Sequence, residues 1–528
     1  VVEYQVPGKE QTDENNFYSK FSPHFAKATE TQSAPWEFGT AAKPYEIMTQ
    51  RNLYNISLGG IKHGDSHYLK SHYAQTQDLE LKDQKLSVPV QSNQEGTMQE
   101  FWKRGIGTAA TDFSGTYTGA AAGGTNHKIL DNRSASAAKP VGYSIFNGMS
   151  KTAKVSNLDY IINKADYRIS ADAILVKTGA GTISGINLTS AAADTKVKVT
   201  TTSPDRFGLI AGEIKAEPGA AEIPAVEKID IRKEISVENQ VSNKEDIGST
   251  VGKITGSANL VDVTSAASLN HTGASGSPAS TGGIAGRVTA PAGSTEQAAL
   301  SLKNVHYLGG KLTVSNAANQ RIGGIAGIME QTDAVIDNAS SSADITVNRT
   351  NGQGAYGGLI GKLIKSDMNL KNGSATGNII EDSSTQSYNQ GGTFGGIIGD
   401  VREVKNIEFT NVTAGSFDAA AGKSATQIQV VNSGSYEAGL GGIIGKAGMA
   451  APGSTAAPNR LVMKNVTNNS SLNLTNAKGS SRIGGILGYA VNYTVEMEDT
   501  ASLGNIEISR NYTNGLGTYG GMIGKLEK

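Results

Sequence analysis

The sequence predicts an all-β chain folded as an elongated parallel β-helix, or β-solenoid, with Gly-Gly-x-x-Gly coils and a small N-terminal cap region. Three observations lead to this fold class. A short glycine motif recurs, the residues between its copies alternate apolar and polar, and 65 Gly accompany only 13 Pro in 528 residues. Charged residues make up 18% of the chain, against about 25% in typical domains, so the glycine excess points to a stacked architecture rather than to a linker or a collagen.

The recurring motif is Gly-Gly, an apolar residue, then Ala, Ile or Leu, and a last Gly. Successive copies start 34 to 46 residues apart, and self-similarity at such a period indicates a repeat architecture. Degenerate copies precede them at Phe207–Gly212 and Ile247–Gly252. The seven intact copies begin at Gly282, Gly323, Gly357, Gly395, Gly441, Gly484 and Gly520.

A longer period lies on top of the short one. The first, second and third motifs recur 159, 161 and 163 residues later as the fifth, sixth and seventh. The match extends beyond the glycines, since Leu302–Gly327 resembles Met463–Gly488 and Asn351–Leu363 resembles Asn514–Leu526. This pattern indicates that four short repeats were duplicated as one block.

Each short repeat contains three strand-like pieces, for example Val305–Val314, Arg321–Met329 and Ala334–Asp337, separated by Asn, Ser, Gly and Asp. Their alternation has the period of a β-strand and not that of a helix. One such coil cannot bury its apolar side alone, so stacked coils should share an interior ladder of Ile, Leu and Val. We therefore expect Ile325 and Ile486 to be interior. Paired glycines suit points where coils bend tightly or approach closely.

The chain divides into three regions. Residues 1–43 are polar and aperiodic, which indicates an extended arm or leader, or alternatively a cap strand on the first coil. Residues 44–140 are expected to hold the cap and first coils, as a short helix plus strands, and residues 141–528 the solenoid of GGxxG repeats. The helix is predicted for Pro44–Ser57, with Thr49 capping its start. Its apolar face would contain Ile47, Leu53 and Ile56.

The first coils contain, in order, the segments PYEIMTQRNLYNIS, HYLKSHYAQTQDLEL, DFSGTYTG with NHKI, and VGYSIFNGMSKTAKVSNLDYII, followed by the GGxxG repeats. This order resembles the opening of bacterial GLUG-repeat surface proteins. That opening has a YxIxTxxxLxNL helix, a YxLxxDIDL strand, an FxGTFDGNGHxI coil and then GLFxxxxxAxVxNL. The DIDL element is QDLEL in this chain, and the GNGH turn is stretched to GAAAGGTNH.

This resemblance covers roughly residues 44–528 and implies a secreted cell-surface protein. Members of the family are typically large bacterial surface proteins, often wall-anchored adhesins, and some immunoglobulin A metallopeptidases carry similar repeats beside a separate catalytic domain. The resemblance thus implies an extracellular location, and partners that are host or cell-wall glycans or proteins, or neighbouring copies of the chain.

Composition excludes several other classes of function. The formal net charge is −1 and no long block of like charge occurs, so nucleic acid and membrane surfaces are poor partners. The chain has no Cys, which excludes disulfides, thiolate metal sites and cysteine nucleophiles. It has no stretch of about 18 apolar residues, so no transmembrane insertion is expected.

The motifs of metal and phosphate chemistry are largely missing from the sequence. No HExxH is present, so the zinc helix of a metallopeptidase is not in this chain. Among seven His, only the segment HGDSHYLKSH clusters; His63, Asp65, His67 and His72 would be its metal ligands, but a solvated loop is the favoured interpretation. The GGxxG motifs lack the Lys-Ser/Thr ending of a phosphate loop. No cofactor or metal site is therefore predicted.

Parallel β-helices also host lyases and glycosidases, which need paired carboxylates, or a basic residue beside a calcium site. The candidate carboxylates Asp382, Asp400 and Glu403 are scattered, and we interpret them as solvated turn or strand residues. We therefore predict no catalytic residue. Tyrosines could instead supply sugar-stacking or adhesive contacts, although coil packing is favoured for the two that directly precede Gly-Gly, Tyr356 and Tyr519. The tyrosine candidates are Tyr307, Tyr356, Tyr388, Tyr436 and Tyr519.

The sequence thus favours a non-catalytic structural or adhesive module of a bacterial cell surface. One alternative is a subunit of an extracellular filament assembled by end-to-end docking. Another is an accessory region of a surface metallopeptidase or of a polysaccharide-degrading enzyme. Because the motif at Gly520 is followed by few residues, we expect a fragment of a longer surface protein or, less favoured, a subunit whose open end docks onto a neighbour, helped by the 1–43 arm.

Overall fold

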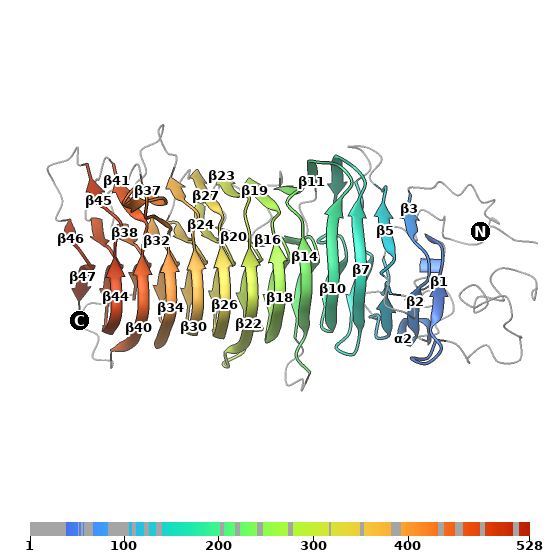
Figure 1. Cartoon of the computed structure of the whole chain (residues 1–528). Helices are drawn as coiled ribbons and strands as arrows, with labels where there is room; N and C mark the ends of the chain where they lie inside the picture. Colours follow the sequence, from blue (N-terminus) through green and yellow to red (C-terminus); the bar gives the residue numbers. More distant parts are fainter. Residues whose placement is uncertain are drawn as a thin grey trace, which may run out of the picture.

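The chain forms a long stack of β-coils with their strands parallel from coil to coil (Figure 1). It is a parallel β-helix, as the repeat predicts. The computed structural model describes residues 39–50, 52–53, 56, 67–82, 105–107, 112–120, 126–133, 140–200, 205–216, 222–239, 246–272, 278–315, 318–348, 353–381, 392–430, 438–448, 458–475, 481–509 and 517–527.

The longest strands form one sheet that runs the length of the stack, here named the wide sheet. β3 (Leu79–Leu81) and β5 (Lys128–Asp131) join it beside β7. The other strands, in spatial order, are β1 (Tyr45–Ile47), β2 (His72–Gln75), β4 (Thr116–Thr118), β7 (Lys154–Ile162), β10 (Thr182–Ser190), β14 (Ala225–Ile231), β18 (Ala258–Ser265), β22 (Ala298–Tyr307), β26 (Thr332–Ser341), β30 (Asp367–Ala375), β34 (Asn406–Ala414), β40 (Asn459–Asn468) and β44 (Tyr493–Ser502).

A second sheet follows the wide sheet in each coil and is named the flanking sheet. Its strands are β8 (Asp166–Ile169), β11 (Thr195–Val199), β15 (Ile235–Asn239), β19 (Ser268–Thr272), β23 (Lys311–Ser315), β27 (Asp344–Asn348), β31 (Ile379–Glu381), β37 (Gln427–Val430), β41 (Ser471–Leu474) and β45 (Ile506–Ile508).

Two further sheets complete the coils. The first inner sheet contains β12 (Arg206–Gly208), β16 (Asp246–Gly248), β20 (Pro278–Gly282), β24 (Ala318–Gly323), β28 (Ala355–Gly357), β32 (Thr393–Gly395), β38 (Ala438–Gly441), β42 (Ser481–Gly484) and β46 (Thr518–Gly520). The second inner sheet contains β6 (Phe146–Met149), β9 (Val176–Gly179), β13 (Ala211–Lys215), β17 (Val251–Thr255), β21 (Ala285–Thr289), β25 (Ala326–Glu330), β29 (Ile360–Ile364), β33 (Ile398–Arg402), β39 (Ile444–Ala447), β43 (Leu487–Val491) and β47 (Ile523–Glu527).

A complete coil has four strands, not the three pieces that the sequence predicts. The piece Val305–Val314 is divided between β22 and β23, because Gly309 and Gly310 adopt positive φ and end the first strand. The piece Arg321–Met329 is divided between β24 and β25 by the glycine motif itself. The third piece lies within β26, which is longer than predicted.

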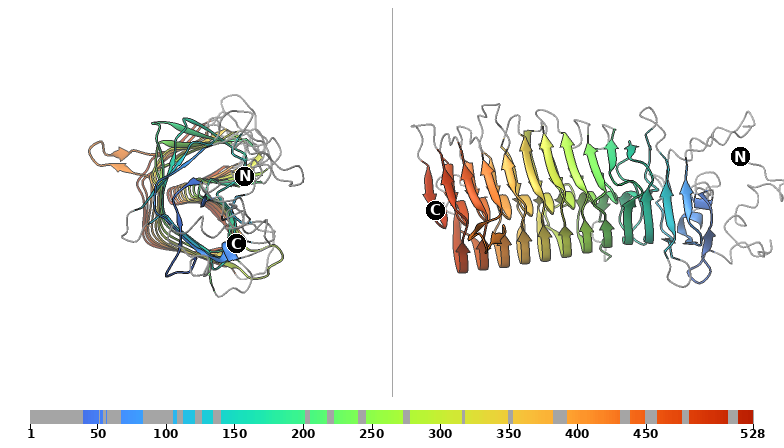
Figure 2. Two further views of the ribbon diagram at one scale, coloured as in Figure 1. Left: turned by 90° about the vertical axis from the view of Figure 1, so that its right-hand side faces the viewer. Right: turned by 45° about the horizontal axis from the view of Figure 1, so that its top comes forward.

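The Gly-Gly-x-x-Gly motif is a buried bend that connects the two inner sheets. In the view along the axis, this bend lies inside the curve of the outer sheets (Figure 2). In the second motif, Gly323 ends β24, Gly324 and Ile325 form the bend, and Ala326 begins β25. The apolar residue after the two glycines is at most 2% exposed in six motifs and forms an interior ladder along the stack. This ladder contains Ile284, Ile325, Leu359, Ile397, Ile443 and Ile486.

Close packing between coils, and not positive φ, explains the second glycine of each motif. The φ angles at these glycines lie outside the left-handed region. A Cβ on Gly358 would lie 2.1 Å from the carbonyl oxygen of Gly396 in the next coil, and a Cβ on Gly396 would lie 2.1 Å from that of Gly442. A Cβ at these glycines would therefore meet the backbone of the next coil, which favours glycine there, whereas the two degenerate bends accommodate Leu209 and Ser249 at the equivalent position.

The two degenerate motifs form the same bend, as the repeat predicts. Phe207 pairs with Ile247, and Gly208 with Gly248, in the first inner sheet. Leu209 replaces the second glycine in the earlier motif, where it is buried, and Ser249 replaces it in the later one. The Ser249 hydroxyl lies 2.6 Å from the Ser265 hydroxyl and donates to the carbonyl oxygen of Gly283. The polar side chain is tolerated because it is hydrogen-bonded where it is buried.

A column of residues with positive φ runs along the outside of the wide sheet, and the sequence analysis missed it. Asparagine tolerates this conformation better than other residues except glycine. The side-chain amide of Asn338 donates to Oδ1 of Asn304 at 2.9 Å, and that of Asn411 donates to Oδ1 of Asn372 at 3.1 Å. The described column comprises Asn157, Gly185, Lys228, Asp262, Asn304, Asn338, Asn372, Asn411, Asn465 and Asp499.

The predicted helix at Pro44–Ser57 is wrong in its first half. Tyr45–Ile47 is strand β1, because these residues pair with β2 of the next coil. Helical conformation begins at Gln50. Thr49 caps it as expected: Thr49 Oγ1 accepts from the Asn52 amide at 3.2 Å, and Asn52 Oδ1 accepts from the Thr49 amide at 3.0 Å. The short helix α2 (His67–Lys70) precedes β2.

The first coils belong to the same stack as the later ones. β1, β2 and β4 pair in sequence with β7, and the buried apolar residues from Tyr45 to Tyr493 form one continuous core. One excursion leaves the stack, where β35 (Phe417–Asp418) and β36 (Lys423–Ser424) form a two-stranded antiparallel ribbon. It projects from the outer surface in the axial view (Figure 2).

Aspartate in place of an interior ladder residue should unfold the neighbouring coils. Ile325 is 2% exposed and Ile486 is fully buried. Ile325→Asp or Ile486→Asp should lower the free energy of unfolding by about 3–5 kcal/mol, because the new carboxylate is buried without a partner. Chemical denaturation and limited proteolysis measure this effect. Val335→Asp is the matched control, since Val335 is 55% exposed on β26. Equal protease resistance in all three variants would contradict the interior assignment.

Alanine at the second glycine should destabilise the chain only where a coil stacks on that bend. Gly358→Ala should cost about 1–3 kcal/mol of stability, because its Cβ meets the backbone of the next coil. Gly521→Ala is the matched control: it occupies the same position in the last motif, where a Cβ would meet nothing within 4 Å. Thermal melting of both variants gives the comparison. Equal melting temperatures would show that coil packing does not require this glycine.

Candidate functional site

The two inner sheets face each other across each bend and carry a pair of facing residues in every coil. The facing residues are seven positions apart in the sequence, two before the first glycine and one after the last. Thus a Cβ on Gly439 would lie 3.2 Å from the Cβ of Lys446. The described pairs are Arg206 and Glu213, Asp246 and Lys253, Ser280 and Arg287, Arg321 and Ile328, Ala355 and Lys362, Thr393 and Asp400, Gly439 and Lys446, Arg482 and Tyr489, and Thr518 and Lys525.

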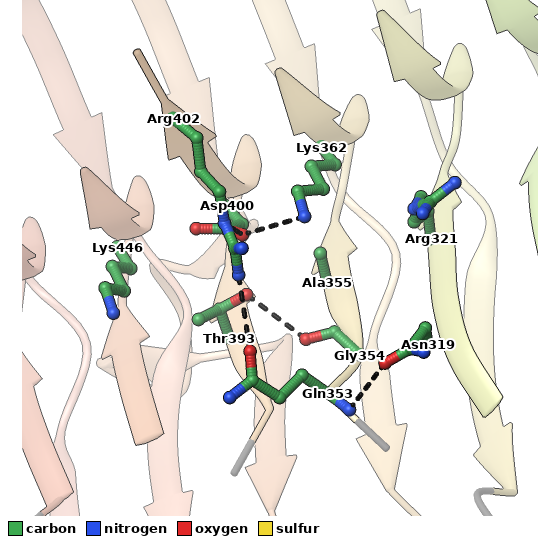
Figure 3. Close-up of a pocket in the computed structure, with 10 residues that line it drawn as sticks. All are labelled: Asn319, Arg321, Gln353, Gly354, Ala355, Lys362, Thr393, Asp400, Arg402 and Lys446. Carbon is green, nitrogen blue, oxygen red and sulfur yellow. Dashed lines mark hydrogen bonds and ion pairs between the residues drawn. The ribbon is translucent and has the colours of Figure 1, made fainter. Parts of the chain in front are cut away.

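A pocket of about 420 Å³ opens between the inner sheets in the second half of the stack (Figure 3). It forms where the facing residues of the first inner sheet are small, namely Ala355, Thr393 and Gly439. We name it the inner-sheet pocket. Its lining residues are Asn319, Arg321, Gln353, Gly354, Ala355, Lys362, Thr393, Asp400, Arg402 and Lys446.

A buried carboxylate lies at the centre of the pocket between two cations. Asp400 Oδ2 lies 2.6 Å from Nε of Arg402 and 3.5 Å from Nζ of Lys362. Its other oxygen, Oδ1, is buried and has no hydrogen-bond partner within the described structure. The side chain of Asp400 is 2% exposed and that of Lys362 is 12% exposed. Burial lowers the pKa of Lys362 to about 8, an effect that the charge of Asp400 only partly offsets.

Uncharged polar groups line the pocket beside these charges. Asn319 Oδ1 accepts from the Gln353 amide at 3.0 Å, and Gln353 Oε1 accepts from Arg402 at 3.4 Å (Figure 3). The Thr393 hydroxyl donates to the Gly354 carbonyl oxygen at 3.2 Å. These contacts join the loop before β28 to both inner sheets, so the pocket wall is held by hydrogen bonds as well as by the bends.

Beyond the pocket, toward the C-terminus, the space between the sheets is filled by stacked side chains. The guanidinium of Arg482 lies 4.3 Å from the centroid of the Tyr489 ring, and Lys446 Nζ lies 5.4 Å from it. Cations attract the face of an aromatic ring within about 6 Å. Arg482 and Tyr489 therefore bound the pocket on this side and leave Lys446 at its edge.

Along the stack, the facing residues of the two inner sheets form two rows, named the facing rows, and the charge of these rows changes from coil to coil. In the earlier coils the charges are paired, since Arg206 lies 2.9 Å from Glu213 and Arg287 lies 2.9 Å from Asp246. From Arg321 onward the two rows contain five cations and one anion. Those cations are Arg321, Lys362, Lys446, Arg482 and Lys525, and the anion is Asp400. The pocket thus lies in the part of the rows with excess positive charge.

The carboxylates that the sequence offered as catalytic candidates differ in burial. Asp400 was interpreted as a scattered, solvated residue, and this is wrong: it is buried in the inner-sheet pocket because its strand β33 faces β32 across the bend. Glu403 is exposed at a corner with positive φ, where it lies 3.6 Å from Lys365. Asp382 lies outside the described residues.

Of the four metal-ligand candidates, His72 is the one whose side chain the structure describes. His72 lies on β2, where its Nδ1 is 2.7 Å from the Thr116 hydroxyl. His63 and Asp65, together with the side chain of His67, lie outside the described part of the chain. Within that part, no group of three or more His, Asp or Glu side chains is placed to hold a metal ion.

Two tyrosine candidates for surface contacts are interior instead. Tyr307 is fully buried and donates to the Ala267 carbonyl oxygen at 2.5 Å, so a sugar-stacking role for it is wrong. Tyr356 is fully buried and stacks on Phe394 at 4.7 Å between ring centroids, which confirms coil packing there. Tyr519 is 39% exposed on β46, at the edge of the stack. Tyr388 and Tyr436 lie outside the described residues.

A second buried polar cluster lies in the first coils and has a structural role. Arg133 donates to both carboxylate oxygens of Asp131 at 3.0 and 2.9 Å, and Tyr160 and Tyr167 donate to the same carboxylate at 2.5 and 2.6 Å. Burial by itself would raise the pKa of Asp131, but Arg133 and the two tyrosines outweigh this effect and lower it. Because all four side chains are buried, this cluster stabilises the core and is not accessible as a ligand site.

No protein-family model, curated protein or solved structure matches this chain significantly. No helix in the described residues has the length and apolar character needed to cross a bilayer.

The sequence analysis did not find the inner-sheet pocket, although the sequence contains a signal for it. The residue directly after the motif is Lys in three of the seven intact copies and Asp in one, as at Lys362, Asp400 and Lys446. The residue two before the motif is small in the same coils. The signal becomes interpretable only once the motif is known to be a bend, because only then do these two positions face each other.

The depressed pKa of Lys362 can be tested by titration. In NMR spectra of the chain with labelled lysine side chains, one signal should titrate near pH 8 and should be lost in Lys362→Met. Asp400→Asn should lower that pKa further, because it removes the negative charge that favours the protonated amine. A wild-type Lys362 signal that does not titrate near pH 8, or an increase of its pKa in Asp400→Asn, would contradict this arrangement.

Proposed function

We propose that this chain is a non-catalytic module of a bacterial cell surface, which displays a binding face on a rigid β-solenoid. The observation that carries the proposal is the stacking of the same four strands in register over coil after coil. Such a stack is stabilised by contacts between neighbouring coils and produces a long surface of repeated positions. The resemblance of the first coils to GLUG-repeat surface proteins supports the extracellular location.

The composition of the inner-sheet pocket favours binding over glycoside hydrolysis. A glycosidase needs two carboxyl groups on opposite sides of the scissile bond. Among the residues that line the pocket, Asp400 is the one carboxylate, and it is held by Lys362 and Arg402. Four cations in the same lining suit the recognition of an anion more than the transfer of a proton to a leaving group. These features support a binding site.

A glycan array probed with the isolated chain tests the proposed function. We expect specific, saturable binding to a subset of host or cell-wall glycans, with no release of products during long incubation. Ile486→Asp, whose coils should be disrupted, is the control for binding by the folded stack. Release of oligosaccharides by the wild type, abolished by a single carboxylate substitution, would contradict a non-catalytic function. A complete lack of binding to glycans and surface proteins would contradict a binding function.

A further inference from the structure

We infer that the inner-sheet pocket binds an acidic polysaccharide, laid along the axis of the stack between the two inner sheets. This inference rests on the proposed binding function and specifies its ligand class and its site. The pocket belongs to two facing rows that continue from coil to coil. An occupant that follows these rows is extended and linear.

The spacing of the cations suits a polymer with regularly placed anionic groups. Neighbouring strands of a sheet lie about 4.8 Å apart, so Lys362 and Lys446, which are two coils apart, are separated along the axis by roughly 9.6 Å. Arg321 lies one coil before Lys362 and extends the series. A single small anion would use one of these positions, whereas a chain of carboxylated or sulfated sugars would use several at once.

The electrostatics of the pocket favour an anion. Four cations and one anion line it, and Lys362 and Arg402 share that anion, Asp400. Beyond the pocket, toward the C-terminus, the rows contain Arg482, which stacks on Tyr489, and Lys525, which pairs with Glu527. Partly buried charges attract a ligand more strongly than exposed ones, since solvent screens them less.

The uncharged lining favours a sugar over a nucleic acid. Asn319, Gln353 and Thr393 bring amide and hydroxyl groups to the pocket, and such groups exchange hydrogen bonds with sugar hydroxyls. The ten lining residues include no aromatic side chain, whereas sites for single-stranded nucleic acid stack bases on aromatic rings. The lining thus combines anion recognition with polar groups for a hydroxyl-rich chain.

Calorimetric titration of the full chain with defined polymers tests this inference. The probes are polygalacturonate for carboxylates, dextran sulfate for sulfates, unmodified dextran as the neutral polymer, and oligo-dT for nucleic acid. We expect polygalacturonate or dextran sulfate to bind, and dextran and oligo-dT not to bind. The double variant Arg321→Ala with Lys446→Ala should weaken polyanion binding by about tenfold or more. Lys371→Ala is the matched control, an exposed cation on the outer face of β30, and should leave binding unchanged.

Asp400→Asn tests for an increase in affinity, which misfolding of the variant would not produce. Removing the one negative charge of the pocket should tighten polyanion binding about threefold or more, because Lys362 and Arg402 then face the ligand uncompensated. Equal affinities in wild type, double variant and Asp400→Asn would overturn the inference, as would a preference for oligo-dT. Binding of neutral glycans alone would overturn it and leave the proposed function standing. Cleavage of a polyanion that requires the pocket cations would support the pocket and contradict the non-catalytic function.

Discussion

The approach of one backbone bend to the next is the constraint on which the rest of the structure depends. The amide of Gly324 donates to the Gly358 carbonyl at 3.1 Å, and the amide of Ile325 donates to the Leu359 carbonyl at 2.8 Å. These bonds continue the parallel sheets around the corner at the strand spacing of about 4.8 Å. At that spacing a Cβ at Gly358 or Gly396 would meet the next coil, whereas the two degenerate bends have Leu209 and Ser249 at this position.

This bend also creates the candidate site. Because every bend has the same length, the residue two before the motif always faces the residue one after it, as Thr393 faces Asp400. A change of side chain at either position therefore alters one step of these two rows without changing the bend. Small residues on one wall open the pocket, and the signs of the charges on both walls set its electrostatic character. The residues of the candidate site can thus vary independently of the core.

The outer surface of the wide sheet is fastened by a different repeated interaction. In the column of positive-φ residues, a backbone conformation that asparagine tolerates is combined with side-chain hydrogen bonds from coil to coil, as between Asn338 and Asn304. The interior ladder at the bends and the column of positive-φ residues on the outside of the wide sheet thus both stabilise the stacking of the coils. Since each coil contacts chiefly its neighbours, stability is approximately a sum of such local terms.

The sequence by itself determined the fold class, the repeat length, the interior position of Ile325 and the cap at Thr49, because these depend on local pattern and on one environment repeated in every coil. It did not determine the division of a coil into four strands, since Gly309 and Gly324 interrupt runs whose alternation appears continuous. It also predicted a helix over Tyr45–Ile47, which pairs instead with a strand far along the chain. The pocket around Asp400 was decided only by the tertiary structure, because two rows meet there through a bend whose direction no linear pattern specifies.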